Sequence, residues 1–168
     1  MKNKLIAIDD DPLILGLIHV TLEKQNFEVI TTTNPYDGLN LFLVDSTLVI
    51  VSDLSMPEMS GADLMQKIFD HGHEPIFIIL TSHTDVKMVV ELFKQGVHDY
   101  IIKPFKHAEL VNRVSKAFEF AELRMIKENI KKEREIRNEH QLNWNLYKES
   151  LIKKDSDKTD SGLMANIN

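Results

Sequence analysis

Four short apolar runs in this sequence are each followed by a reactive side chain. The runs are residues 5–8, 48–51, 76–80 and 100–102. The reactive residues that follow them are Asp9, Asp10, Asp53, Thr81 and Lys103. In an open parallel sheet, ligands and chemistry gather in the crevice beyond the carboxyl ends of the strands. If the four runs are parallel strands, these residues meet at one edge and predict a metal and phosphoryl site.

The first 120 residues alternate between strand patterns and helix patterns five times. Apolar residues recur at helical spacing between the runs, and proline, asparagine and glycine mark the turns. The predicted strands are continuously apolar, as expected for a parallel sheet covered on both faces. Alternation of strand and helix is typical of βαβ units with right-handed crossovers. The sequence therefore predicts an α/β fold with a doubly wound, five-stranded parallel sheet.

Composition excludes several classes of function. The 168 residues contain no cysteine, so disulfides, thiolate chemistry and cysteine-bound zinc are excluded. No apolar stretch approaches the roughly 20 residues that span a bilayer, and the amino terminus does not resemble a secretory signal. The net charge is −6, with no clustered basic face of the kind that nucleic-acid binding uses. We expect a cytoplasmic protein without a membrane or a direct nucleic-acid partner.

The last predicted helix runs past the end of the domain. Neither proline nor glycine occurs from Lys106 to Lys154, which permits more than ten turns at about 3.6 residues each. Large side chains recur at a three–four spacing, with polar residues in the middle of the same register: Leu123, Ile126, Ile130, Glu133, Arg137, His140, Trp144, Tyr147 and Leu151. This pattern predicts a coiled-coil seam, out of phase with the core-facing residues Leu110, Val114, Ala117 and Ala121. A solvated single helix is the alternative.

Three segments follow from these patterns. Residues 1–121 form the predicted α/β domain that carries the site, and residues 122–154 form a coiled-coil helix that links this domain to a further part of the protein. Residues 155–168 begin with a polar stretch that predicts a flexible tail, leading to an effector outside this sequence.

The acidic residues suit a hard cation. Adjacent carboxylates repel one another unless a cation or solvent screens them, and Mg²⁺ takes one or two carboxylates and keeps several waters. We expect Asp10 and Asp53 to bind Mg²⁺ directly, Asp9 to act through water, and the backbone carbonyl of Ser55 to add an oxygen. Asp11, beside Pro12, is expected to cap the first helix.

Asp53 is the candidate phosphoryl acceptor. Its carboxylate would attack phosphorus while the metal and Lys103 neutralise the transferring oxygens, and the Thr81 hydroxyl would bond one of them. Lys103 precedes Pro104, and a cis bond between them would aim the lysine inward.

The motifs LIAIDDDP, VIVSDLSMPEMSG, IILTSHTD and DYIIKPF resemble, in order and spacing over residues 4–120, the receiver domain of two-component response regulators. The resemblance implies a flavodoxin-like, CheY-like fold and a histidine kinase as the phosphodonor to Asp53. It implies that Asp9 and Asp10 bind Mg²⁺ and that Thr81 and Tyr100 form a switch pair. Ser55 and His83 match two variable positions that tune phosphoryl lifetime.

The same resemblance implies a homodimer face on the fourth helix, fifth strand and fifth helix. Asp99, Glu109 and Arg113 match its acidic and basic positions, and Lys87 and Lys94 are candidates on the fourth helix. Phosphorylation would alter dimer packing along the long helix and regulate an attached effector, such as a histidine kinase or a nucleotide cyclase.

Two alternatives remain. A small aspartate-nucleophile phosphatase would use Asp9 and Asp11 as an Asp-x-Asp motif, but it leaves Asp53 without a role. A receiver that has lost its chemistry and serves only as an interaction module would keep the fold, but all five site residues are present.

Overall fold

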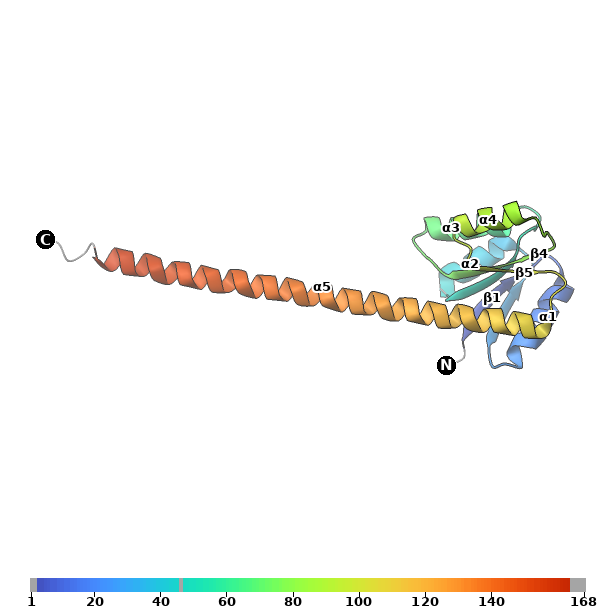
Figure 1. Cartoon of the computed structure of the whole chain (residues 1–168), viewed down its shortest axis with the longest axis horizontal. Helices are drawn as coiled ribbons and strands as arrows, with labels where there is room; N and C mark the ends of the chain where they lie inside the picture. The colour runs from blue at the N-terminus through green and yellow to red at the C-terminus, as the bar shows by residue number, and fades with distance from the viewer. Residues whose placement is uncertain (1–2, 46, 164–168) are drawn as a thin grey trace. The chain divides into compact units, whose positions relative to one another are not determined.

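The computed structural model describes residues 3–45 and 47–163. It divides into two compact units that meet in the sequence at Leu123 and Arg124. The first unit contains the sheet and its helices (Figure 1).

Five parallel strands form a single sheet, as predicted. The strands are β1 (Lys4–Ile8), β2 (Glu28–Thr32), β3 (Val49–Asp53), β4 (Ile76–Thr81) and β5 (Asp99–Ile102). Their order is β2-β1-β3-β4-β5, and every neighbouring pair is parallel. The chain reverses its winding direction between β1 and β3, and a doubly wound sheet binds its ligands outside the carboxyl ends of strands at such a point.

Helices cover both faces of the sheet. They are α1 (Pro12–Glu23), α2 (Pro35–Asp45), α3 (Gly61–Asp70), α4 (Val86–Lys94) and α5 (His107–Leu163). One core cluster joins the sheet to α1 and the first part of α5, through residues such as Ile18 and Val114. The other cluster joins the opposite face to α2, α3 and α4, through residues such as Phe42, Leu64 and Leu92.

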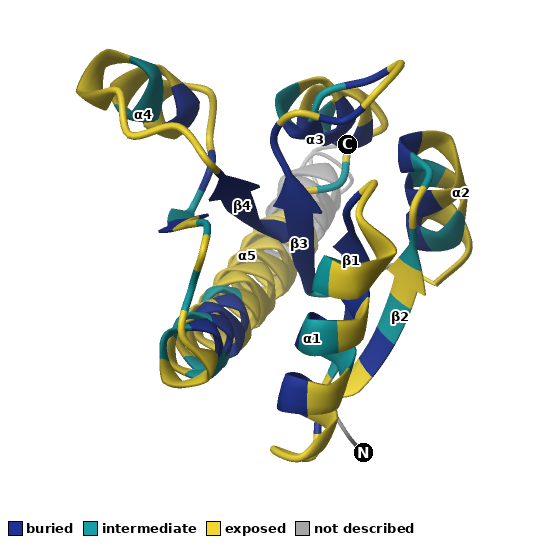
Figure 2. Ribbon diagram, turned by 90° about the vertical axis from the view of Figure 1, so that its right-hand side faces the viewer, coloured by how far each residue is buried: buried dark blue, intermediate teal, exposed yellow. Residues whose placement is uncertain are grey.

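The two cores explain why the strands are continuously apolar. Successive side chains of a strand point to opposite faces, so Leu5 and Ala7 pack in one cluster while Ile6 and Ile8 pack in the other. Figure 2 shows β3 and β4 buried along their length, with each surrounding helix buried on one side. A sheet covered in this way leaves its carboxyl edge as the place for polar side chains.

Helix caps fix the loops that leave that edge. The Asp11 side chain accepts a hydrogen bond from Leu13 N at the start of α1, which confirms its expected role as a cap. Ser60 and Asp63 form a reciprocal capping box at the start of α3. Asp85 caps α4 through Lys87 N. Each loop therefore leaves its strand with a defined direction.

The helix α5 is longer than the sequence indicated. The predicted end was Lys154, with a flexible tail from Asp155, whereas the structure continues the helix through Leu163. Asp, Ser and Thr lower helix propensity by at most about 0.7 kcal/mol each, and Pro104 is the last proline before this stretch. Polar composition alone therefore does not end the helix. The remainder of the predicted tail, residues 164–168, lies outside the described residues.

Within the described part of the chain, no helix is long and apolar enough to cross a membrane.

Candidate functional site

Asp9, Asp53 and Lys103 meet at the carboxyl edge of the sheet. They follow or end β1, β3 and β5, and the Lys103 ammonium lies 2.6 Å from Asp9 Oδ2 and 2.5 Å from Asp53 Oδ1. Asp9 is fully buried and Asp53 nearly so. The Lys103–Pro104 peptide is cis. One cation thus bridges the two carboxylates that the sequence placed together.

The second oxygen of each carboxylate accepts a backbone hydrogen bond. Asp11 N donates to Asp9 Oδ1 at 3.0 Å, and Ser55 N donates to Asp53 Oδ2 at 2.8 Å. A carboxylate held on both oxygens has a defined orientation. Ser55, expected to act through its carbonyl, therefore also positions Asp53 through its N–H.

Burial and charge act against each other in this cluster. Burial raises the pKa of Asp9, and the hydrogen bond and charge of Lys103 only partly offset that rise. Burial would lower the pKa of Lys103, but the hydrogen bonds and charges of Asp53 and Asp9 outweigh burial and raise it. The lysine is therefore held as a cation, while Asp9 ionises less readily than a free aspartate.

The predicted metal ligands are only partly assembled as side chains. Asp10 is exposed beside buried Asp9, and among the described residues no three acidic or histidine side chains form a metal-binding group. Lys103 occupies the space between Asp9 and Asp53. A Mg²⁺ site here therefore needs the Ser55 carbonyl and water in addition to carboxylates, which is how Mg²⁺ is usually bound.

In the phosphatase alternative, the second aspartate would be Asp11, and its carboxylate is engaged elsewhere. It required Asp9 and Asp11 to work together, but the Asp11 carboxylate caps α1. Asp9 is bonded to Lys103 and to the backbone of Asp11. Asp53, which that alternative leaves without a role, is instead held at the centre of the site.

Thr81 and Tyr100 lie on neighbouring strands. Thr81 ends β4 with its side chain buried, and its Oγ1 accepts a hydrogen bond from His83 N at 3.0 Å. Lys103 N donates to the carbonyl of Thr81 at 2.8 Å, which ties β5 to β4 beside the site. The Tyr100 ring meets Phe93 of α4 edge-on, with ring centroids 5.9 Å apart. Tyr100 therefore connects β5 to α4.

Gly61 has a role that the sequence did not reveal beyond marking a loop. A Cβ at this position would lie 2.3 Å from the backbone oxygen of Asp53 and 3.0 Å from Ser52 Oγ. Gly61 N also donates to Leu54 O at 3.0 Å. The start of α3 thus packs directly against the backbone of Asp53, which only glycine permits.

The predicted dimer-face residues are close together within one chain. Arg113 Nη1 donates to both Asp99 carboxylate oxygens at 2.8 Å. Glu109 lies on α5 one turn before Arg113. On α4, Lys94 pairs with Glu91 at 2.8 Å, and Lys87 is exposed. Nearby exposed apolar residues of α4 are Val86, Val90 and Phe93.

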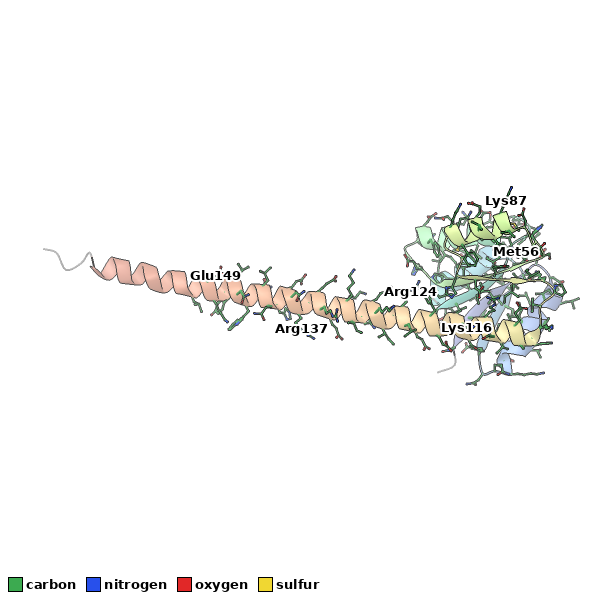
Figure 3. The ribbon with its side chains drawn as sticks, viewed as in Figure 1. Met56, Lys87, Lys116, Arg124, Arg137 and Glu149 are labelled. Atoms are coloured by element: carbon green, nitrogen blue, oxygen red, sulfur yellow. The ribbon has the colours of Figure 1, made fainter. Side chains whose placement is uncertain are left out.

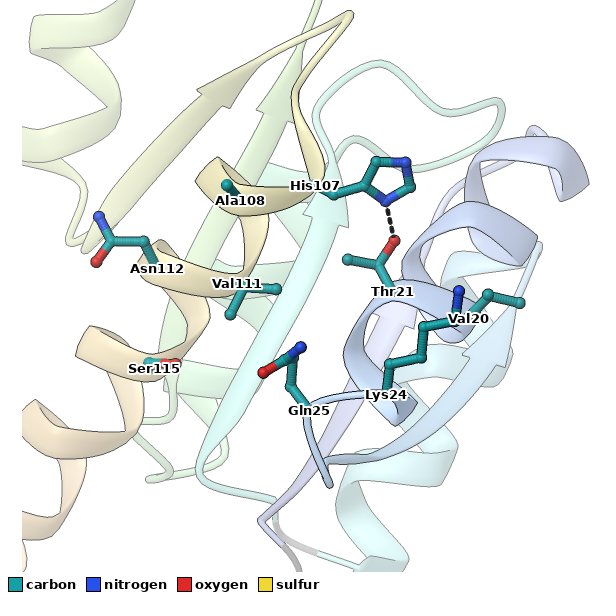
Figure 4. Close-up of a pocket in the computed structure, with 9 residues that line it drawn as sticks. All are labelled: Val20, Thr21, Lys24, Gln25, His107, Ala108, Val111, Asn112 and Ser115. Carbon is teal, nitrogen blue, oxygen red and sulfur yellow. Dashed lines mark hydrogen bonds between the residues drawn. The ribbon is translucent and has the colours of Figure 1, made fainter.

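A groove lies away from the cluster of Asp9, Asp53 and Lys103. It has a volume of about 720 Å³ and lies between α1 and the start of α5, lined by Val20, Thr21, Lys24, Gln25, His107, Ala108, Val111, Asn112 and Ser115 (Figure 4). Its two walls are joined where Thr21 Oγ1 and His107 Nδ1 lie 2.5 Å apart. No carboxylate lines this groove, so it does not offer the chemistry of the Asp53 site.

Comparison with known proteins gives one consistent family. The family model of the response regulator receiver domain matches residues 5–115. The transcriptional regulatory protein SrrA of Staphylococcus aureus is 35% identical over 114 residues, which cover 68% of this chain and 47% of SrrA. The chain therefore spans about half the length of that curated relative.

Solved receiver domains have the same fold. A response regulator receiver domain protein from Clostridium thermocellum is 31% identical with a TM-score of 0.66, and the match covers 71% of this chain and 97% of that one. The receiver domain of the Francisella response regulator 1452 is 27% identical with a TM-score of 0.67, covering 70% and 98%.

Proposed function

Since this chain belongs to the response regulator receiver family, whose members are phosphorylated by histidine kinases, we propose that Asp53 is the phosphoryl acceptor. The observation that carries the proposal is the three-residue cluster at the sheet edge. Asp53 is held there by Ser55 N and by the Lys103 ammonium, which also contacts Asp9.

Mg²⁺ is the proposed cofactor, because the available donors are hard oxygens. Asp9, Asp10 and Asp53 with the Ser55 carbonyl would hold it, and water would complete its coordination. When bound, Mg²⁺ supplies positive charge that neutralises the oxygens of the phosphoryl group.

The proposed reaction is a simple exchange of bonds. An Asp53 carboxylate oxygen attacks phosphorus, the bond from phosphorus to the donor histidine nitrogen breaks, and that nitrogen keeps the bonding electrons and takes up a proton. Lys103 contributes positive charge beside the acceptor oxygen. Ser55 and His83 border Asp53 and Thr81 through their backbone N–H groups, and we expect their side chains to set the lifetime of the phosphoryl group.

The switch would pass from Thr81 to α4. In the proposal, the Thr81 hydroxyl exchanges its bond from His83 N for a phosphoryl oxygen, and Tyr100 moves with it. Support comes from the contact of Tyr100 with Phe93, since a movement of this ring changes the packing of α4. The exposed apolar residues of α4 and the Asp99–Arg113 pair then form the variable part of a dimer face with Glu109.

Output would travel along α5. Residues 1–121 act as the receiver, and residues 122–154 act as the coiled-coil link to an effector. The proposed effector is a histidine kinase or a nucleotide cyclase. The boundary agrees with burial along α5, because Ala121 is 1% exposed while Leu123 is 57% exposed.

Phosphotransfer tests the assignment. The full chain is incubated with acetyl phosphate or a phosphorylated histidine kinase and Mg²⁺, and phosphoprotein is measured by mass spectrometry. We expect labelling of the parent chain and of Asp70→Asn, a control at an exposed aspartate of α3, and none of Asp53→Asn. Equal labelling of Asp53→Asn and the parent would show that the acceptor lies elsewhere.

A further inference from the structure

A stripe of large side chains is exposed along α5 from Leu123 to Leu151. Its apolar members are Leu123, Ile126, Ile130, Trp144, Tyr147 and Leu151, each between 43% and 57% exposed. The rings of Trp144 and Tyr147 stack on each other 5.8 Å apart. Glu133, Arg137 and His140 continue the same three–four spacing and complete the stripe, which we name the seam.

The seam begins where the receiver core on α5 ends. The core positions are Leu110, Val114, Ala117 and Ala121, all buried. The two residues from Ala121 to Leu123 turn an α-helix through about 200°, so the seam occupies the opposite side of α5. In Figure 3 the side chains along this part of the helix, Arg137 and Glu149 among them, project away from it. The receiver's own core thus leaves the seam uncovered.

We propose that the seam pairs with the same seam of a second copy, parallel and without offset. This inference rests on the proposed receiver dimer and specifies how its helices meet. A seam sustained over four heptads is long enough for a coiled coil, and a second copy supplies an identical three–four spacing. A parallel pair also keeps both receivers at the same end, as a shared dimer face requires.

Charges beside the seam favour the parallel arrangement. With Leu123 at heptad position a, Glu122 is at g and Lys127 at e, and parallel pairing places each Glu122 beside the Lys127 of the other copy. The remaining flanking pairs, Asn129–Arg134, Ile136–Gln141 and Asn143–Lys148, contain no like charges. An antiparallel pair that faces Ile126 with Trp144 would instead bring Arg134 against the Arg134 of the other copy.

The polar block of the seam fixes the offset. Without offset, apolar layers meet apolar layers, and Glu133 lies one layer from Arg137 of the other copy, twice by symmetry. A slip of one heptad would set Arg137 against Ile130 or Trp144, which buries an unpaired charge in an apolar layer. Buried polar residues commonly specify register in this way at a cost in stability.

Cysteine cross-linking tests orientation and offset, because the chain contains no cysteine of its own. Ile130→Cys lies in the seam, and Glu128→Cys lies at the outer position f of the same turn. A disulfide requires Cα atoms about 4.4–6.8 Å apart. Under mild oxidation of the full-length protein we expect covalent dimer from Ile130→Cys at least about tenfold faster than from Glu128→Cys. Leu151→Cys against Glu149→Cys should repeat the result at the far end.

A mixed sample detects the competing arrangement. In the antiparallel pairing above, residue 130 faces residue 140 of the other copy, so Ile130→Cys and His140→Cys chains would cross-link to each other rather than to themselves. That outcome, or equal rates for Ile130→Cys and Glu128→Cys, overturns the proposal.

The charge pattern provides a second test. Glu133→Lys places like charges beside Arg137 of the other copy and should weaken the dimer about tenfold or more in sedimentation equilibrium. The double variant Glu133→Arg with Arg137→Glu should restore it. Failure of the double variant to restore dimerisation contradicts the paired layers.

These tests do not depend on phosphorylation. The same cross-links measured in Asp53→Asn separate the two proposals. Intact cross-linking in Asp53→Asn that is not labelled supports both, whereas labelling of the parent chain without seam cross-links leaves the receiver chemistry and removes the coiled coil.

Discussion

The ionisation of buried Asp9 opposes folding. Because burial raises its pKa in the folded state, the stability that Asp9 contributes is fully present below its unfolded pKa of about 3.9 and is lost as the pH rises through the folded pKa. In Asp9→Asn this dependence disappears. We expect the free energy of unfolding of Asp9→Asn, relative to the parent, to rise as the pH increases from about 4 toward neutrality.

Urea unfolding at a series of pH values without Mg²⁺ measures this difference. Asp70→Asn, at an exposed position of α3, serves as the control and should show no such rise. A relative stability of Asp9→Asn that falls with pH in this range would mean that Lys103 outweighs burial at Asp9. Lys103 itself does not interfere, because its raised pKa places its own loss of stabilisation at alkaline pH.

Metal binding should offset the destabilisation that the ionised Asp9 carboxylate causes. A ligand that binds only the folded state raises the free energy of unfolding by mass action, and the proposed Mg²⁺ site requires the ionised carboxylates. Added Mg²⁺ should therefore raise the melting temperature of the parent and have a much smaller effect on Asp9→Asn and Asp10→Asn. Calorimetry with and without Mg²⁺ tests this, with Asp70→Asn again as the control. An equal rise in all four proteins would indicate general salt stabilisation.

At the scale of elements, the start of α3 sets the position of Asp53. Gly61→Ala places a methyl group against the Asp53 carbonyl, where backbone must move. We expect a loss of about 1–3 kcal/mol in stability and slower phosphorylation. Gly16→Ala is the matched control, since nothing lies within 4 Å of its Cβ in α1, and there alanine should stabilise by about 0.5–1 kcal/mol. Denaturation and labelling rates of both variants decide whether the contact controls the site.

Some features of the site and of the helices were predictable from the sequence, and others were not. Asp9, Asp53 and Lys103 were predictable because parallel strands bring their carboxyl ends to one edge, whatever the side-chain rotamers. The contact of Tyr100 with Phe93 was not, because it depends on how α4 packs across β5. The approach of Gly61 to Asp53 joins a loop to a strand end and leaves no periodic signal. The end of α5 was misplaced because polar composition does not distinguish an exposed helix from a flexible chain.

At the scale of the whole molecule, the two units should differ in what keeps them folded. The receiver unit has two apolar cores, whereas the side chains of residues 122–151 are almost all exposed. In proteins most helical stability comes from the packing of an amphipathic face, so we expect the seam of a second copy to stabilise the distal part of α5. Helical content should therefore rise with protein concentration, while the thermal unfolding of the receiver changes little.

Far-UV circular dichroism over a dilution series, with near-UV signals for the receiver, measures the two units separately. Ile126→Asp places a charge in an apolar layer of the seam and should reduce helical content to its dilute value at every concentration. Glu128→Ala, on the outer face of the same turn, should keep the concentration dependence. Phosphorylation of the parent should shift the midpoint to lower concentration, by a factor within the roughly 5–150-fold range of coupled sites. A helical signal independent of concentration in the parent would mean that α5 is stable alone, and the receiver would then need another route to its effector.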